Sequence, residues 1–120
     1  MAVAVKPKSA IQRAVRKYLL LHNIDSVAVP NGAHLAGDKV ARIRQMAAMK
    51  ADGLRPGFPD LLLYPRHLAS IGHVEIKTEG GKLSDAQADC HAWLAGMGHR
   101  VAVVRSVEDM ADTLVEWGWK

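Results

Sequence analysis

Apolar side chains are distributed along the chain in two patterns, a helical repeat and short continuous runs, which together predict four helices and four strands. Between Ser9 and about His22 they return every three or four residues, the spacing of one helix face. The same period marks three further segments, at about 39–51, 84–97 and 106–117. Short apolar runs of strand length occupy four others, at 26–29, 60–64, 71–78 and 100–105.

The order of these elements, α-β-α-β-β-α-β-α, predicts an α/β fold in which helices cover a central mixed sheet. The run at 60–64 is apolar throughout, which indicates burial on both faces, and we expect it to pair with 71–78 as a hairpin. No internal repeat and no linker divides the chain. We therefore expect one domain over 9–120, preceded by a short flexible lead at 1–8.

Two of the predicted helices have an apolar side that we expect to pack on the body of the domain. In the segment 39–51 that side consists of Val40, Ile43, Met46 and Ala47. In the segment 84–97 it consists of Ala86, Cys90, Trp93, Leu94 and Met97. Ser84 and Gln87 also have the spacing of a capping box, which predicts where this second helix begins.

Composition confines the chain to ordinary globular domains. A length of 120 residues suits one domain, and an apolar fraction of 49% with 23% charged residues excludes collagen-like, low-complexity and disordered classes. Apolar runs such as 19–21 and 61–63 are far shorter than a membrane span, so we expect no membrane partner. Cys90 is the only cysteine, which excludes an internal disulfide and favours an intracellular, reducing setting.

The charge is unevenly distributed. Residues 1–60 hold ten basic and four acidic side chains, a net of +6, whereas residues 61–120 hold six and eight, a net of −2. A basic first half indicates a polyanionic partner, nucleic acid above all, although a solvated surface has the same composition. The candidate phosphate-binding residues lie in and just after the second helix: Lys39, Arg42, Arg44, Lys50 and Arg55.

One group of polar residues indicates chemistry. Asp60 comes at the start of a buried strand, and Glu75 and Lys77 lie on one face of the next because strand side chains alternate. If the strands pair, the two carboxylates converge near a sheet edge, where they and a main-chain carbonyl suit Mg²⁺. An adjacent lysine can orient a water or neutralise a phosphate. Glu-x-Lys alone is typical of a solvated strand face; the combination with Pro59-Asp60 favours a site.

These segments resemble a known family. Gly53 to Leu61, His73 to Lys77 and Leu83 to Gln87, followed by Gly98 to Asp109, look like the VRR-NUC nuclease domain, a branch of the PD-(D/E)XK or restriction-endonuclease-like superfamily. The similarity runs roughly from residue 9 to residue 115. It implies a restriction-endonuclease-like core in a stand-alone member of the kind found in phages and bacteria.

The resemblance assigns roles to individual residues. Asp60, Glu75 and the main-chain carbonyl of Ile76 would bind the catalytic metal, Mg²⁺ or Mn²⁺, and Lys77 would position the attacking water. Gln87 would lie near the metal's water or a phosphate, a role that can coexist with capping its helix. Many relatives carry a Glu on the first helix a few residues before a Gln. Here Gln12 is preceded by Lys8, Ser9 and Ala10, so the site is expected to have one carboxylate fewer.

By this resemblance the chain is expected to be a metal-dependent DNA endonuclease acting on structured or branched DNA, such as Holliday junctions or flaps. A homodimer is expected, because symmetric cleavage of a junction needs two sites, and the location is the cytoplasm of a bacterial cell or phage-infected host. The alternative is a nucleic-acid-binding module that kept the fold without the activity. A small-molecule enzyme has no support, because phosphate-loop, nucleophile-elbow and dinucleotide motifs are missing from the sequence.

The remaining candidates have simpler interpretations. His91 lies one helical turn after Gln87, so it fits either the edge of the site or, as the main expectation, the surface. Trp93 and Trp117 are expected to belong to the apolar faces of helices. Trp119 is expected to serve a subunit interface. The apolar runs 19–21 and 115–119 fit either that interface or the core of the monomer.

Overall fold

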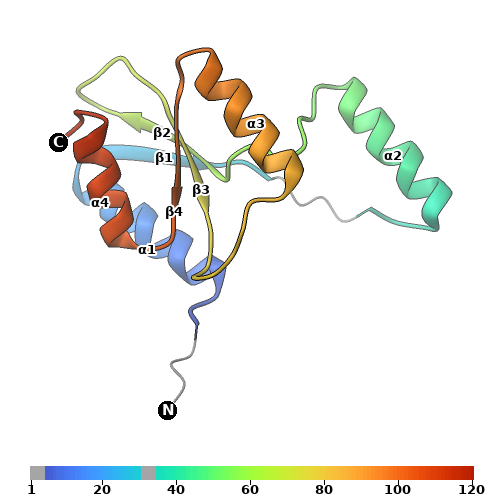
Figure 1. Ribbon diagram of the computed structural model, residues 1–120, viewed down its shortest axis with the longest axis horizontal. Helices are drawn as coiled ribbons and strands as arrows, with labels where there is room; N and C mark the ends of the chain where they lie inside the picture. Colours follow the sequence, from blue (N-terminus) through green and yellow to red (C-terminus); the bar gives the residue numbers. More distant parts are fainter. Residues whose placement is uncertain (1–4, 31–34) are drawn as a thin grey trace.

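The computed structural model describes residues 5–30 and 35–120 (Figure 1). Its eight elements occur in the predicted order. They are α1 (Lys8–Leu21), β1 (Ile24–Ala28), α2 (Lys39–Ala51), β2 (Leu61–Pro65), β3 (Gly72–Ile76), α3 (Asp85–Gly96), β4 (Arg100–Val104) and α4 (Val107–Glu116). Because α1 already begins at Lys8, the lead before the domain is shorter than predicted, and residues 1–4 lie outside the described residues.

The four strands form one mixed sheet, as predicted, and their order in it is β1-β2-β3-β4. The pairs β1·β2 and β2·β3 are antiparallel, so the expected hairpin is present, and β3·β4 is parallel. β3 lies between two neighbours, and all five of its residues are buried.

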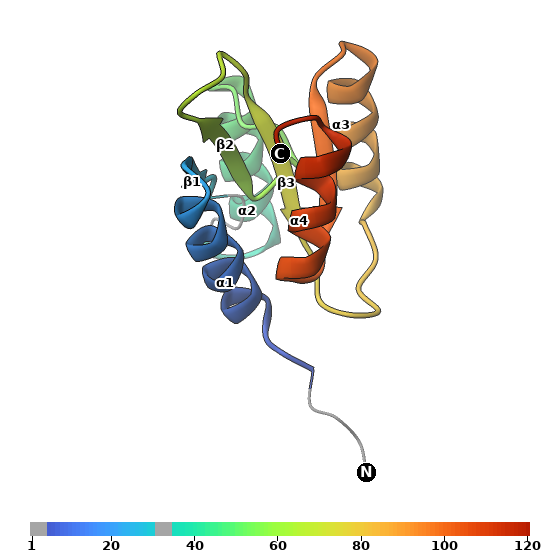
Figure 2. The same ribbon diagram turned by 90° about the vertical axis from the view of Figure 1, so that its left-hand side faces the viewer.

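The two faces of the sheet are covered by different helices (Figures 1 and 2). α1 and α4 pack against each other and against the face to which Val74 and Ile76 contribute. α3 packs against β4 and reaches the opposite face, where it meets Glu75. Since side chains alternate along β3, the apolar core and the polar residues at 73 and 75 lie on opposite faces of the sheet.

The main core consists of buried side chains from α1, α4 and the sheet, closed by the C-terminal tail. Trp117 and Trp119 pack edge to face at a centroid distance of 5.0 Å and are 9% and 7% exposed. They fit because β3 begins at Gly72, where a Cβ would lie 2.5 Å from the Trp117 ring. The assignment of Trp119 to a subunit interface is therefore wrong, since the indole fills the core of its own chain.

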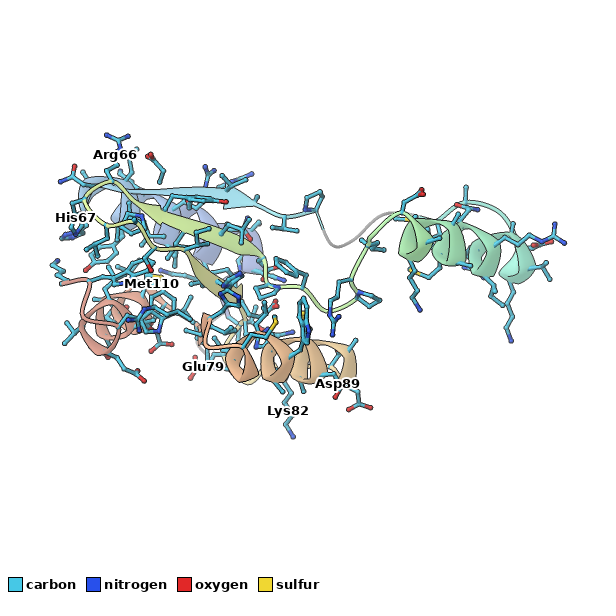
Figure 3. All side chains as sticks on the ribbon, turned by 90° about the horizontal axis from the view of Figure 1, so that it is seen from above. Arg66, His67, Glu79, Lys82, Asp89 and Met110 are labelled. Atoms are coloured by element: carbon cyan, nitrogen blue, oxygen red, sulfur yellow. The ribbon has the colours of Figure 1, made fainter. Side chains whose placement is uncertain are left out.

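α2 does not pack as predicted. The helix has its expected bounds and is capped by Asp38, which accepts a hydrogen bond from the Ala41 amide. None of its residues is buried, and among the described residues it packs against no other helix or strand. Val40 and Ile43, expected to face the body, are 57% and 58% exposed. Figures 1 and 3 show α2 standing apart from the rest of the molecule.

The projecting helix also sets the dimensions of the molecule. The Cα radius of gyration is 15.8 Å. A compact domain of this length has a radius of about 13.6 Å. Within the described residues, no helix combines the length and apolarity needed to span a membrane.

Candidate active site

Asp60 and Glu75 lie side by side on two neighbouring strands. Leu61 of β2 pairs with Val74 of β3 in the antiparallel register, which places Asp60, the preceding residue, opposite Glu75. Asp60 Oδ2 accepts a hydrogen bond of 2.8 Å from the Ile76 amide. The predicted convergence of the two carboxylates is therefore present, and the Ile76 backbone lies beside them.

The segment before Asp60 is fixed by the close approach of Gly57 to α3. Gly57 has a φ of +78°, and a Cβ at this position would lie 2.3 Å from the backbone of Ala86 and 2.5 Å from the Gln87 nitrogen. Only glycine combines this backbone conformation with this contact. Gly57 thus holds the loop that carries Asp60 against the first turn of α3.

Gln87 connects that first turn to Glu75. The main-chain N–H of Gln87 donates to Ser84 Oγ at 3.2 Å, and the Gln87 side-chain oxygen accepts from the main-chain N–H of Ser84 at 2.9 Å. These two bonds complete the predicted capping box. The Gln87 Nε2 then donates to Glu75 Oε2 at 3.4 Å. The capping interpretation of Gln87 is confirmed, and the same side chain also reaches the Glu75 carboxylate, because the cap holds its oxygen and leaves its nitrogen free to donate.

His91 follows one helical turn later and also faces Glu75. Its Nε2 lies 3.5 Å from Glu75 Oε1, and its side chain is only 12% exposed. The main expectation of a surface histidine is wrong and the alternative at the edge of the site fits, because His91 shares with Gln87 the side of α3 that meets Glu75. Within the described residues, neither His91 Nε2 nor Glu75 Oε1 has a hydrogen-bond partner, and both atoms are buried.

Lys8 reaches the carboxylates from the other side of the sheet. Its Nζ lies 3.0 Å from Asp60 Oδ1 and 3.6 Å from Glu75 Oε2. The basic residue that stands before Gln12 therefore contacts the site itself. Nothing in the hydrophobic pattern pointed to this contact, which joins residues 52 positions apart.

The electrostatics of the pair follow from its burial. Glu75 is 0% exposed, and desolvation together with the neighbouring Asp60 raises its pKa to about 8. Burial also acts to raise the pKa of Asp60, but hydrogen bonds from Glu75, the Ile76 amide and Lys8 outweigh it and leave that pKa below its usual range. In the metal-free protein, these opposite shifts favour one shared proton on the Asp60–Glu75 pair, with the negative charge preferred on Asp60.

Lys77 and the neighbouring histidines complete the polar surroundings. Lys77 follows directly after β3, and its charge opposes the rise in the pKa of Glu75. Burial and the Lys77 charge lower the pKa of His91, which favours a neutral imidazole there. Burial also lowers the pKa of His73, whose Nδ1 lies 2.9 Å from the Arg100 carbonyl oxygen.

The donor set fits a hard divalent cation bound by few protein ligands. Among the described residues, no three His, Cys, Asp or Glu side chains gather closely enough to form a metal cluster. Asp60 and Glu75 nevertheless bring carboxylate oxygens together beside the Ile76 backbone, and oxygen ligands are the ones that Mg²⁺ and Mn²⁺ prefer. The buried Glu75 Oε1 lies 3.5 Å from His91 Nε2 but makes no hydrogen bond among the described residues, so it remains an acceptor that a cation could occupy.

The candidate DNA-binding residues separate into two groups. Lys39, Arg42 and Arg44 lie on the projecting α2. Lys50 and Arg55 instead border an open groove of about 850 Å³ between the end of α2, the following loop and α3. The Arg55 guanidinium stacks 3.6 Å above the ring centroid of Trp93, which is 41% exposed rather than buried in a helix face.

The apolar side of α3 that is actually buried is narrower than predicted. Cys90 and Leu94 are buried, whereas Ala86, Trp93 and Met97 are exposed. Figure 3 shows Asp89 on the same helix, and this residue borders the groove together with Trp93. The buried side of α3 thus packs against β4. Asp89 and Trp93 border the groove, and Gln87 and His91 contact Glu75.

Comparisons with known proteins agree with this geometry. The model of the VRR-NUC domain family matches residues 5–108. A solved structure described as a VRR_NUC domain protein is similar with a TM-score of 0.63 and 17% identity, over 95% of this chain and 89% of that one, which shows a shared fold. No curated protein matches the chain. The family match covers most of the sequence, and the chain therefore belongs to the VRR-NUC family of nuclease-type domains.

Proposed function

We propose that this protein is a divalent-metal-dependent endonuclease that hydrolyses phosphodiester bonds in structured or branched DNA, such as Holliday junctions or flaps. The observation that carries the proposal is the pairing of Asp60 with the buried Glu75, whose Oε1 makes no hydrogen bond among the described residues. Membership of a nuclease-type family supports the reaction class.

In this proposal Asp60, Glu75 and the Ile76 carbonyl hold Mg²⁺ or Mn²⁺, which supplies Lewis-acid stabilisation of the phosphate. Lys77 positions the attacking water and offsets negative charge that builds on the phosphate oxygens. Gln87 fixes Glu75 Oε2 through its side-chain amide. The role of Gln87 is to hold that carboxylate in one orientation while the other residues meet the substrate.

DNA binding is assigned to the basic residues of α2 and its following loop. Lys39, Arg42 and Arg44 are exposed on a helix that extends the molecule, and we propose that they bind backbone phosphates. Lys50 and Arg55 line the groove beside α3, whose first turn carries Gln87. In this proposal Lys50, in the last turn of α2, and Arg55, in the loop after it, bind phosphates along the groove.

We further propose that the active unit is a homodimer. One chain carries one carboxylate pair, and two-fold symmetry is the usual way to cut two strands in concert. The support is α2, whose Val40 and Ile43 remain exposed on a helix without packing partners among the described residues. Apolar surface left uncovered in this way is typical of an interface between subunits.

The competing proposal is a DNA-binding module without catalysis. Lys8 favours it, because its ammonium already neutralises the carboxylates that a metal would need. A cleavage assay separates the two: a four-way junction, a flap and a linear duplex of matched sequence are incubated with Mg²⁺, Mn²⁺ or EDTA. Metal-dependent incision of the branched substrates supports the nuclease. If every substrate stays uncut although the protein still binds it, the result supports the DNA-binding module.

A further inference from the structure

Lys8 contacts both carboxylates from an element that lies on the opposite side of the sheet from α3. It is the first residue of α1, and its Nζ lies 3.0 Å from Asp60 Oδ1 and 3.6 Å from Glu75 Oε2. The ammonium thus touches one oxygen of each residue proposed to bind metal.

Interactions within α1 do not explain a lysine at its first position. The N-terminus of a helix carries partial positive charge, which disfavours a cation in the first turn. That turn holds no acidic residue, and the N-cap, Pro7, supplies no side-chain hydrogen bond. The partners that stabilise the Lys8 charge are therefore the carboxylates rather than the helix that carries it.

The Lys8 side chain is also exposed enough to move away from the carboxylates into solvent. It is 44% exposed, whereas the side chains of Asp60 and Glu75 are 13% and 0% exposed. A lysine has a flexible four-carbon stem, so the ammonium can swing into water while the carboxylates stay in place. A divalent ion bound by the same two carboxylates would lie within a few ångströms of the Lys8 ammonium, and like charges at that distance repel each other strongly where water is partly excluded.

We propose that Lys8 is a built-in cation of the carboxylate pair, which a divalent ion must displace into solvent in order to bind. Lys8 therefore determines how much free metal the site requires. The inference rests on the metal site of the proposed function and deepens it, since it names the residue that competes with the ion. In the metal-free protein, the same contact stabilises the pairing of Asp60 with Glu75.

The first test measures binding of the ion alone, without DNA. Mn²⁺ affinity is determined by electron paramagnetic resonance, and Mg²⁺ affinity by calorimetry, for the wild type, Lys8→Met and the control Lys17→Met. Lys17 is an exposed lysine on the same helix, which makes it a matched control. Loss of the competing charge should tighten binding in Lys8→Met by about tenfold or more, with Lys17→Met unchanged. Equal or weaker binding by Lys8→Met overturns the inference.

A second readout uses the wild-type chain and does not depend on a variant. Lysine amines are reductively methylated with and without saturating Mg²⁺, and the modification of Lys8 is quantified by mass spectrometry against that of Lys17. Displacement predicts that Lys8 becomes several-fold more reactive when Mg²⁺ is present, while Lys17 does not change. Unchanged or reduced reactivity of Lys8 contradicts displacement.

The two proposals fail in different ways. If the wild type and both variants bind Mg²⁺ and Mn²⁺ with equal affinity, Lys8 does not compete, and the metal site of the proposed function stands. If no form of the protein binds either ion, the metal site and the role of Lys8 fall together.

Discussion

The side-chain amide of Gln87 lies between the cap of its own helix and Glu75. Its oxygen accepts from the Ser84 amide at 2.9 Å, and its Nε2 donates to Glu75 Oε2 at 3.4 Å. The start of α3 and the orientation of the buried carboxylate are thus fixed by one side chain. This relationship allows the structural role of Gln87 to be separated from its role at the site.

The first prediction makes that separation. Gln87→Ala removes both contacts, whereas Ser84→Ala removes the cap and leaves the Gln87 amide near Glu75. Each variant should lose about 1 kcal/mol of folding free energy. Only Gln87→Ala should also weaken metal binding, by about tenfold, because it frees the carboxylate. Denaturant unfolding and calorimetry measure the two effects, and equal metal affinity in both variants would remove Gln87 from the site.

The second prediction concerns Lys77. We expect Lys77→Ala to lower the cleavage rate by about 10²-fold or more, since it removes the group proposed to position water and offset phosphate charge. Its Mn²⁺ affinity should not fall, because a lysine is not a ligand of the ion. Single-turnover cleavage and Mn²⁺ titration measure the two quantities. A rate close to that of the wild type would show that Lys77 lies outside the reaction.

The sequence was sufficient to predict the carboxylate pair, for a simple geometric reason. Alternation along a strand places Glu75 and Lys77 on one face, and a short hairpin connection brings Asp60 opposite Glu75. Both inferences depend only on local spacing. The expectation that the two carboxylates lie near a sheet edge was wrong for Glu75, however, because β3 is a central strand and Glu75 is 0% exposed.

Contacts that depend on tertiary placement could not be predicted in the same way. An amphipathic pattern shows that Val40 and Ile43 share a face of α2, but it does not show what covers that face. The contact of Lys8 with Asp60 depends on where α1 crosses the sheet, and that of His91 with Glu75 on the tilt of α3. The only sequence signal for Lys8 was its place a few residues before Gln12.

The third prediction tests the assignment of DNA binding to α2. Replacing Arg42, Arg44 and Lys50 by Ala should weaken binding to all DNA sequences. Each lost phosphate contact should reduce the slope of log affinity against log salt by about 0.9. The control replaces Arg13, Lys17 and Lys82, which are exposed elsewhere and carry the same total charge. Equal salt slopes in both triple variants would mean that α2 faces away from the DNA.

The fourth prediction concerns the homodimer. Light scattering at micromolar concentration should give twice the 13.0 kDa mass of the chain. Ile43→Glu, which places a charge on the exposed face of α2, should reduce this to the mass of one chain. Leu68→Glu changes a residue that is 40% exposed in the connection between β2 and β3 and should leave the dimer intact. A wild-type monomer, with and without branched DNA, would refute the dimer and leave the nuclease proposal in place.

The most direct test of the central claim is cleavage by Glu75→Gln, since this change keeps the volume of a wholly buried side chain and removes its charge. Incision of a four-way junction is measured for the wild type and the variant in Mg²⁺, Mn²⁺ and EDTA, with folding checked by circular dichroism. We predict that the wild type incises the junction only with a divalent ion, and that folded Glu75→Gln does so with neither ion. Wild-type rates in the folded variant, or incision that persists in EDTA, would contradict a metal-dependent nuclease centred on Asp60 and Glu75.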